Sequence, residues 1–357
     1  MGAVTTIERS VSYVTDRITR MAELRTPTGG TLILTRTDVR ESLDMAECIE
    51  AVERAFRLHG SGEAPAPAVA SVHVPEGAFH VKAGVLPVGN RAYFVAKTNA
   101  NFPRNPSRYG LPTIQGTLVV CDTERGTPLA LMDSIEITAL RTAAATAVAA
   151  KHLSRNDATR LAIIGCGLQG ESHLRALSLV RQVACVALYD LNPHAARSLA
   201  GQAERDFDWK ATVAGSPAEA AAGADIVVTC TTSSEFLLGA DDVAAGALVA
   251  GVGVDSERKR ELHPELLRRS KVVVDVLAQC AAFGDLHHAI EAGVMQPDAV
   301  HAELGAIVAR RQPARESERE VIVFDSTGMA LQDAAAASLV YGRALTLGRG
   351  TMVNFGQ

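Results

Sequence analysis

A glycine-rich turn near the middle of the chain has the spacing that binds nucleotide phosphates. The apolar run Leu161–Ile164 is followed by Gly165, Gly167 and Gly170, in the pattern G-x-G-x-x-G. In such a turn the first glycine permits a sharp bend, the second lets a pyrophosphate approach the backbone, and the third lets a helix pack closely on a strand. Because the helix that begins there also offers unpaired N–H groups, the turn predicts a dinucleotide site.

An acidic residue at the end of the next expected strand indicates which dinucleotide binds. The run VACVALYD ends in Asp190, twenty residues after Gly170, where a carboxylate accepts hydrogen bonds from the ribose hydroxyls of NAD. A carboxylate there disfavours a 2′-phosphate, so NAD is expected rather than NADP. The alternative is a structural turn without a ligand. Further cofactor contacts are expected at the helix N-terminus and after two later strands, from Leu168, Gln169, Thr231, Thr232, Val252 and Gly253.

Three cations in the first half of the chain are candidates for holding a substrate. Lys97 interrupts the apolar run YFVAKTNANF, Lys82 lies in the run before it, and Arg141 stands near the start of an Ala-rich helix. Nicotinamide chemistry needs a substrate that is held against the ring. Arg binds a carboxylate through two hydrogen bonds and Lys through a point charge, so these residues could fix the carboxylate of an amino or imino acid. The alternative is that they are surface cations.

A carboxylate follows another apolar run, at the edge of the expected sheet where ligands bind. Asp255 comes after ALVAGVGV, and from there it could accept a proton from an amine or pair with a substrate ammonium. Its alternative role is to cap a helix over SERKREL. Asp275 is placed similarly after KVVVDV, and Asp285 is expected to cap a helix.

No metal site is expected. His287 and His288 are the only adjacent histidines, and neighbouring residues on a helix point about a hundred degrees apart, which argues against joint ligation. The six cysteines have no metal-ligand spacing, and we expect them to be reduced core residues of a cytoplasmic protein: Cys48, Cys121, Cys166, Cys185, Cys230 and Cys280.

The elements that must position these residues form two domains of an α/β protein. From Arg155 to 329, strands alternate with helices, which predicts a doubly wound Rossmann-type sheet for the dinucleotide. Residues 31–154 are expected to form a second domain with a strand and helix, three extended runs, a loop over NFPRNPSRYGLP, a hairpin that turns at Arg125–Gly126, and the Ala-rich helix. The final helix, ALQDAAAASLVYGRAL, is expected to return to this domain.

Size and composition exclude several classes of protein. A chain of 357 residues is long enough for two cores. A net charge of -5 and a low aromatic fraction argue against a nucleic-acid surface. No signal peptide and no membrane span are expected, and residues 1–30 are interpreted as an N-terminal extension.

Several segments between about Leu32 and Leu345 together resemble the ornithine cyclodeaminase/mu-crystallin family. They are VAKTNANFPRN, GLPTIQGTLVVCD, GTPLALMDSIEITALRTAAATAVAAKHL, IIGCGLQG, GVGVDSERKREL, FGDL and FDSTGMALQD. The resemblance implies a Rossmann domain joined to an α+β substrate and dimerisation domain built from both chain ends (31–154 and 330–357), in a homodimer. It also implies that Lys97 and Arg141 hold the substrate α-carboxylate and that Asp255 handles the substrate amine.

The chain departs from the family pattern in one place that bears on the substrate. The family usually has an arginine ahead of the substrate strand, whereas the run AVASVHV offers Ala70 or a neighbour and no cation. Where many members read Met-Pro-Ala, this chain reads Lys82-Ala83-Gly84. The hypothesis is that Lys82 supplies the missing charge.

Three functions follow from the resemblance. The first is an NAD-dependent imine reductase or amino-acid dehydrogenase that moves hydride between nicotinamide and Cα. The second is ornithine cyclodeamination to proline with loss of ammonia, in which NAD is regenerated. The third is a crystallin-like protein that binds the cofactor with little turnover.

Overall fold

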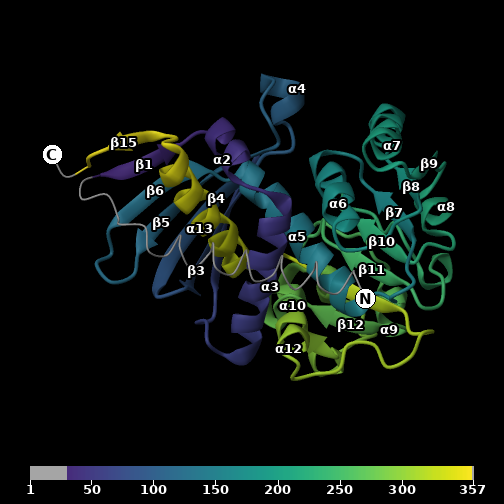
Figure 1. Cartoon of the computed structure of the whole chain (residues 1–357). Coiled ribbons are helices and arrows are strands. Elements are labelled where there is room, and N and C mark those ends of the chain that lie inside the picture. The colour runs from purple at the N-terminus through teal and green to yellow at the C-terminus, as the bar shows by residue number, and fades with distance from the viewer. Residues whose placement is uncertain (1–29, 356–357) are drawn as a thin grey trace, which may run out of the picture. The chain divides into compact units, whose positions relative to one another are not determined.

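Two sheets, each in its own unit of the chain, make up the structure (Figure 1). The computed structural model describes residues 30–355. Within this range, unit 1 comprises residues 30–55, 62–141 and 330–355, and unit 2 comprises residues 56–61 and 142–329. The extension expected over residues 1–30 therefore lies outside the described residues, except for Gly30.

Unit 1 is built on a seven-stranded sheet in the order β15-β1-β6-β5-β4-β3-β2. Only β1 and β6 pair in parallel, and the other neighbours are antiparallel. The predicted hairpin is present, because β5 and β6 pair antiparallel. Gly126, in the turn between them, adopts a φ of 68°. The strands are β1 (Thr31–Leu34), β2 (Ala68–Val74), β3 (Gly77–Val88), β4 (Arg91–Asn101), β5 (Ile114–Asp122), β6 (Pro128–Asp133) and β15 (Thr351–Val353).

The last helix of the chain packs on this first sheet, as predicted. Helix α13 contacts β3 and β4, and small residues allow the close approach: a Cβ on Gly84 would lie 3.2 Å from the Cβ of Ala330. The segment predicted as loop contains one short exposed helix, α4, which ends at Gly110 in the left-handed conformation. The helices are α2 (Arg36–Ser42), α3 (Met45–Ser61), α4 (Asn105–Tyr109), α5 (Ile135–Leu153) and α13 (Ala330–Leu347). Helices α3 and α5 each contribute residues to both units.

Unit 2 contains the predicted doubly wound sheet, with eight parallel strands in the order β13-β12-β14-β11-β10-β7-β8-β9. The strands are β7 (Arg160–Ile164), β8 (Cys185–Tyr189), β9 (Lys210–Val213), β10 (Ile226–Thr229), β11 (Leu248–Gly251), β12 (Lys271–Val274), β13 (Ala302–Glu303) and β14 (Ile322–Asp325). The helices are α6 (Leu168–Ser178), α7 (Pro193–Phe207), α8 (Pro217–Ala221), α9 (Pro264–Arg268), α10 (Leu277–Phe283), α11 (Asp285–Glu291) and α12 (Leu304–Val308), with 3₁₀ turns η1 (Ala240–Asp242) and η2 (Pro297–Ala299).

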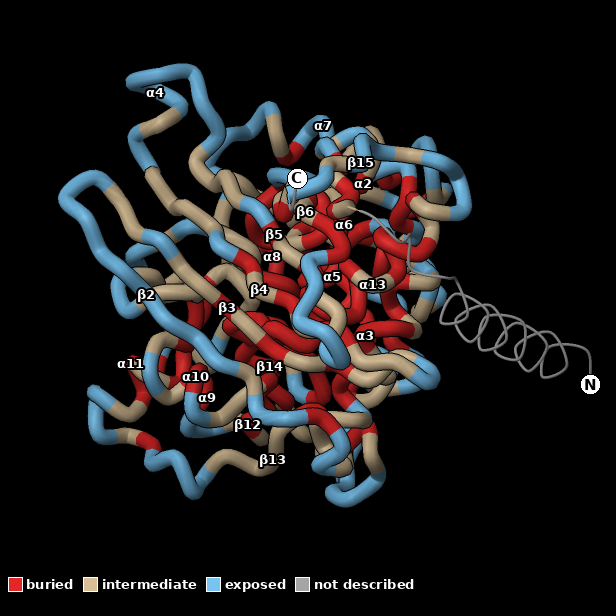
Figure 2. Tube along the Cα trace, turned by 90° about the vertical axis from the view of Figure 1, so that its left-hand side faces the viewer, coloured by how far each residue is buried: buried red, intermediate tan, exposed pale blue. Residues whose placement is uncertain are grey.

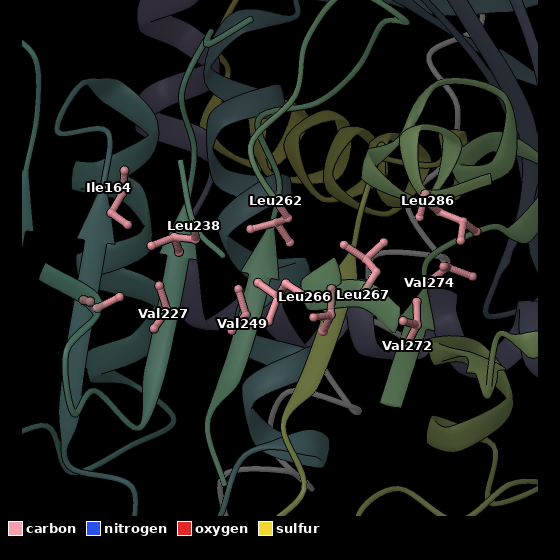
Figure 3. Close-up of a cluster of buried hydrophobic side chains, with 14 of the residues drawn as sticks. Ile164, Val227, Leu238, Val249, Leu262, Leu266, Leu267, Val272, Val274 and Leu286 are labelled. Atoms are coloured by element: carbon pink, nitrogen blue, oxygen red, sulfur yellow. The ribbon is translucent and has the colours of Figure 1, made fainter. Parts of the chain in front are cut away.

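A buried apolar cluster holds one face of this second sheet to the segments that cover it (Figure 3). The strands contribute Ile164, Val227 and Val249, and the covering segments contribute Leu262 and Leu286. Strands of a parallel sheet are covered on both faces, which explains why their sequences read as unbroken apolar runs. The same packing fixes the carboxyl ends of the strands, where the predicted cofactor loops begin.

Burial is uneven in unit 1, because its edge strand β2 is exposed along its whole length (Figure 2). Val69, Val72 and Val74 on this strand are among the exposed large hydrophobic residues. No helix within residues 30–355 is long and apolar enough to cross a membrane.

Candidate active site

The glycine turn of unit 2 has the geometry that its sequence predicts. Gly165 adopts a φ of 105°, which permits the bend after β7. A Cβ on Gly170 would lie 2.4 Å from the Gly165 carbonyl oxygen, so only glycine allows α6 to pack there. A Cβ on Gly167 would meet no atom within 4 Å, which leaves open space beside the backbone.

The N-terminus of α6 is free to receive an anion. Gly167 is the N-cap of this helix and provides no side-chain cap, so the first N–H groups of α6 have no partner of that kind. Leu168 and Gly167 are exposed, and Gln169 is half-buried. A pyrophosphate fits the open space at Gly167 and the positive end of the helix.

Asp190 lies beside this turn, at the end of β8. One oxygen of its carboxylate accepts a hydrogen bond from the Cys166 N–H at 2.7 Å, and the other accepts from the Asn192 N–H at 2.8 Å. The carboxylate is therefore fixed against the glycine turn, where the ribose of a dinucleotide bound at Gly167 would reach it.

A buried carboxylate that no sequence motif singles out joins the two remaining loops that are predicted to contact the cofactor. Glu261 is fully buried; it accepts hydrogen bonds from the N–H and hydroxyl of Thr231, from the hydroxyl of Thr229, and from the N–H of Gly253. Burial raises the pKa of Glu261, and the hydrogen bonds from these four donors offset part of this rise. Glu261 thereby holds together the segments that contain Thr231, Thr232, Val252 and Gly253.

Three further buried carboxylates extend this network along the edge of the sheet. The prediction that Asp285 caps a helix is wrong, because its carboxylate accepts the N–H groups of Glu261 and Leu262 instead. Burial raises the pKa of Asp325 to about 7, and burial together with the charge of Asp325 raises the pKa of Asp285 well above its usual range. Asp275 accepts hydrogen bonds from Ser326, Gly328 and Val276. These acids position loops rather than face solvent.

In unit 1, the structure brings Lys97 and Arg141 to one carboxylate oxygen. Lys97 Nζ lies 2.8 Å and Arg141 Nε 2.9 Å from Oδ1 of Asp333, in the first turn of α13. Arg141 also donates to the side-chain oxygen of Gln332 at 2.9 Å. Both cations are buried, with residue exposures of 2% and 6%, so the alternative of surface cations is wrong. Arg141 lies nearly two turns inside α5 rather than near its start.

Charge is unevenly balanced in this cluster, which we call the cation cluster (Lys97, Arg141, Asp333, with Lys82). Two cations share one carboxylate, so positive charge remains for a second anion. Burial lowers the pKa of Lys97 to about 7; Asp333 opposes this shift, whereas Arg141 and Lys82 add to it. Burial would raise the pKa of Asp333, but the charges of Lys97 and Arg141 outweigh it and hold that pKa below its usual range.

Lys82 belongs to the same face of the sheet as Lys97. The two residues are direct cross-strand partners in β3 and β4, and Lys82 pairs with Val69 of β2 on its other side. Lys82 is buried, with an exposure of 8%. Directly opposed residues share a face of a sheet, so Lys82 points to the side that carries Lys97. Its role as a substitute for an arginine on β2 stays a prediction.

Asp255 lies in unit 2, after β11, in a segment without a regular helix. Its carboxylate forms an ion pair with Lys259 at 2.7 Å. Because no helix begins at SERKREL, Asp255 is not a helix cap. The cation cluster and Asp255 are thus contributed by different units.

The two histidine side chains do not diverge as helical geometry predicts, and the expectation that they bind no metal stays a prediction. The rings of His287 and His288 lie 5.3 Å apart, and one nitrogen of each ring lies within 4 Å of the same oxygen of Glu291. Although the side chains of adjacent helical residues diverge at their base, two rotatable bonds in each bring the imidazoles together. All six cysteines are free thiols. Cys48, Cys166 and Cys280 are buried, whereas Cys121, Cys185 and Cys230 are only half-buried, so the expectation of core positions is wrong for these three.

Comparisons with known proteins agree with these features. The model of the ornithine cyclodeaminase/mu-crystallin family matches residues 30–347. The alanine dehydrogenase of Archaeoglobus fulgidus is 37% identical over 325 residues, which cover 91% of this chain and 98% of that protein.

Solved structures are similar over nearly the whole chain. An archaeal alanine dehydrogenase dimer with bound NAD has a TM-score of 0.86 at 36% identity and covers 91% of this chain and 99% of its own. The Δ1-pyrroline-2-carboxylate reductase of Thermococcus litoralis, in complex with NADH and L-proline, has a TM-score of 0.85 at 33% identity and covers 90% of this chain and all of its own. With its Rossmann-type unit and its match over residues 30–347, this chain belongs to the ornithine cyclodeaminase/mu-crystallin family.

Proposed function

We propose that the protein is an NAD-dependent oxidoreductase that moves hydride between nicotinamide and the Cα of an amino or imino acid. In this proposal it acts as an imine reductase or an amino-acid dehydrogenase. The observation that carries the proposal is the convergence of buried Lys97 and Arg141 on one oxygen of Asp333. Two buried cations around one carboxylate are suited to bind a second, incoming carboxylate.

The residues of the glycine turn fit NAD. The pyrophosphate would lie at Gly167 and the N-terminus of α6, and the ribose hydroxyls would donate to Asp190. When bound, the nicotinamide supplies or accepts the hydride. Relatives whose structures contain NAD or NADH support NAD over NADP.

The remaining steps fall to side chains of the chain itself. Lys97 and Arg141 bind and orient the α-carboxylate, which fixes Cα in position for transfer. Asp333 keeps the two cations together and limits their mutual repulsion. Asp255, or a water that it binds, accepts or returns the proton of the amine.

The ion pair of Asp255 favours a substrate without a second amine. In ornithine cyclodeamination, Asp255 would have to engage the δ-amine of the substrate. In this structure Lys259 already pairs with Oδ1 of this carboxylate at 2.7 Å, and a δ-ammonium of the substrate would have to compete with it. We therefore place imine reduction ahead of cyclodeamination.

One assay separates the three functions. The protein is mixed with NADH and a panel of imino acids, and separately with NAD and ornithine, while cofactor absorbance and ammonia are followed together. The proposal predicts oxidation of NADH by an imino acid. Ammonia without a net change in cofactor would instead identify a cyclodeaminase, and no reaction in either mixture would identify a binding protein.

We also propose that the protein forms a homodimer through unit 1. A similar solved structure is described as a dimer. In this chain β2 exposes three valines on the edge of its sheet, and an apolar edge strand of this kind is normally covered. A second copy of the chain is the cover that we propose.

A further inference from the structure

His287, His288 and Glu291 lie on one helix of unit 2 and direct their polar atoms to a common point. His287 Nε2 is 3.6 Å and His288 Nδ1 is 3.8 Å from Oε2 of Glu291, and the ligand atoms of all three residues lie within 4.8 Å of one another. Two ligands that each lie about 2.1 Å from a tetrahedral zinc ion are about 3.4 Å apart. Small side-chain adjustments would therefore place an ion between them.

The hydrogen bonds of the two rings leave the correct nitrogens available to a metal. His287 Nδ1 donates to the carbonyl of Ala281 at 3.2 Å, and His288 Nε2 donates to the carbonyl of Lys259 at 2.7 Å. A carbonyl oxygen only accepts, so these nitrogens carry the protons of the neutral rings. The lone pairs then lie on His287 Nε2 and His288 Nδ1, the two atoms that face Glu291. A metal-binding histidine typically donates its other N–H to a carbonyl in this way.

The cluster is accessible from solvent on one side. His288 and Glu291 line a cavity of about 540 Å³, together with Phe236 and Arg260. The side chain of Glu291 is 68% exposed, whereas that of His288 is 6% exposed. One ligand is thus fixed in the protein and another can close over an entering ion.

We propose that His287 Nε2, His288 Nδ1 and the carboxylate of Glu291 form a binding site for a divalent transition metal of the zinc class. Two imidazoles and one carboxylate suit zinc and leave a fourth position for water or an anion. Because His288 donates to Lys259, which pairs with Asp255, a bound ion would also stiffen the segment that contains Asp255. This site shares no residue with the glycine turn or the cation cluster.

The test is a zinc titration of the full, untagged chain against a chromophoric chelator. We expect one zinc site per chain that is weakened at least about tenfold by Glu291→Gln and by His287→Gln. Glu291 is exposed and both substitutions keep the size and polarity of the side chain, so each variant should fold as the wild type does. His194→Gln and Glu204→Gln on exposed positions of α7 are the matched controls and should bind zinc as the wild type does.

Cobalt provides a readout of the ligands themselves. We expect Co²⁺ to give visible ligand-field bands without the intense sulfur-to-metal charge-transfer absorption of a thiolate, and to lose these bands in Glu291→Gln. Zinc binding of unchanged stoichiometry and affinity in both cluster variants would overturn the proposal, as would a wild-type chain that binds no zinc. A thiolate spectrum would overturn it too, because it would assign the ion to a cysteine.

Discussion

At the scale of single residues, the surroundings of Lys97 decide whether its amine is protonated near neutral pH. The side chain is buried beside one carboxylate and two other cations, so the ammonium is only weakly favoured over the neutral amine. An incoming substrate carboxylate would favour the ammonium and restore the balance. In the proposed function, the substrate carboxylate is the anion that completes the cation cluster.

The first prediction follows from the pKa of Lys97, which is lowered to about 7. The free enzyme carries the ammonium below this pH and the neutral amine above it, and only the ammonium attracts a carboxylate. We therefore expect kcat/KM for an imino acid to fall as the pH rises through about 7. Lys97→Arg keeps its charge over this range, so its profile should lack this fall even if its activity is lower. A fall that persists unchanged in Lys97→Arg would contradict the assignment.

The second prediction concerns Lys82. If its charge helps to bind the substrate carboxylate, Lys82→Met should raise KM for the imino acid about tenfold or more, the effect of losing one charged hydrogen bond. The KM for NADH should stay unchanged, because the glycine turn lies in unit 2. Lys210→Met is the control, because Lys210 is an exposed residue on strand β9 of unit 2, and it should leave both KM values unchanged. An unchanged KM for the imino acid would remove Lys82 from the site.

Site residues could be predicted from the sequence where a short motif identifies them, and could not where they meet a partner far away along the chain. Gly165, Gly167 and Gly170 were predictable because their spacing itself encodes the turn. Asp333 was not, since it meets Lys97 from 236 positions away along the chain. An ion pair of this kind depends on the return of α13, which the sequence predicts only as a helix that packs on the first sheet.

At the scale of elements, the three glycines of the turn perform separable tasks. Gly170 is required by the fold, because any side chain at this position would overlap the backbone of Gly165. Gly167 faces open space and is required only by what approaches it. The same motif therefore contains one position that the fold requires and one that we propose as a binding position.

The third prediction separates these two positions. Gly167→Ala should fold with a free energy of unfolding within about 1 kcal/mol of the wild type, yet bind NADH at least about tenfold more weakly, because the methyl group occupies the pyrophosphate site. Gly170→Ala should lower the free energy of unfolding by about 2 kcal/mol or more, because its methyl group would overlap the Gly165 carbonyl. Thermal unfolding and fluorescence titration with NADH measure both effects. Equal losses of stability in the two variants would refute this division.

Element order was largely predictable, whereas the loops that join the elements were not. Unbroken apolar runs predicted the central strands of unit 2, because a parallel sheet buries both of its faces. The short edge strands β9 and β13 carry no such run and were missed. The network through Glu261 was also missed, because hydrogen bonds between loops leave no periodic pattern in a sequence.

At the scale of the whole molecule, unit 1 leaves an apolar edge strand uncovered, which a single chain would normally avoid. Strand β2 is exposed along all of its seven residues and carries apolar side chains. Such an edge invites pairing with another chain. The other sheet ends in a short edge strand, β9, which exposes Val213.

The fourth prediction uses these two edges as test and control. Val72 is 59% exposed on β2 and Val213 is 43% exposed on β9. If the homodimer forms through unit 1, Val72→Glu should shift the protein toward a monomer, because it buries a charge in the interface. Val213→Glu should leave the mass unchanged. Light scattering after size-exclusion chromatography measures the mass, and a Val72→Glu variant that stays a full dimer would place the interface elsewhere.

The most direct measurement of the proposed function follows the hydride itself. NADH that carries deuterium at C4 of the nicotinamide, on either face, is supplied with an imino acid, and the product amino acid is examined by NMR and mass spectrometry. We predict that one of the two labelled forms of NADH transfers its deuterium to Cα of the product, and that Lys97→Met slows this transfer. A product without deuterium from either form, or with deuterium on another carbon, would contradict the function proposed for this protein.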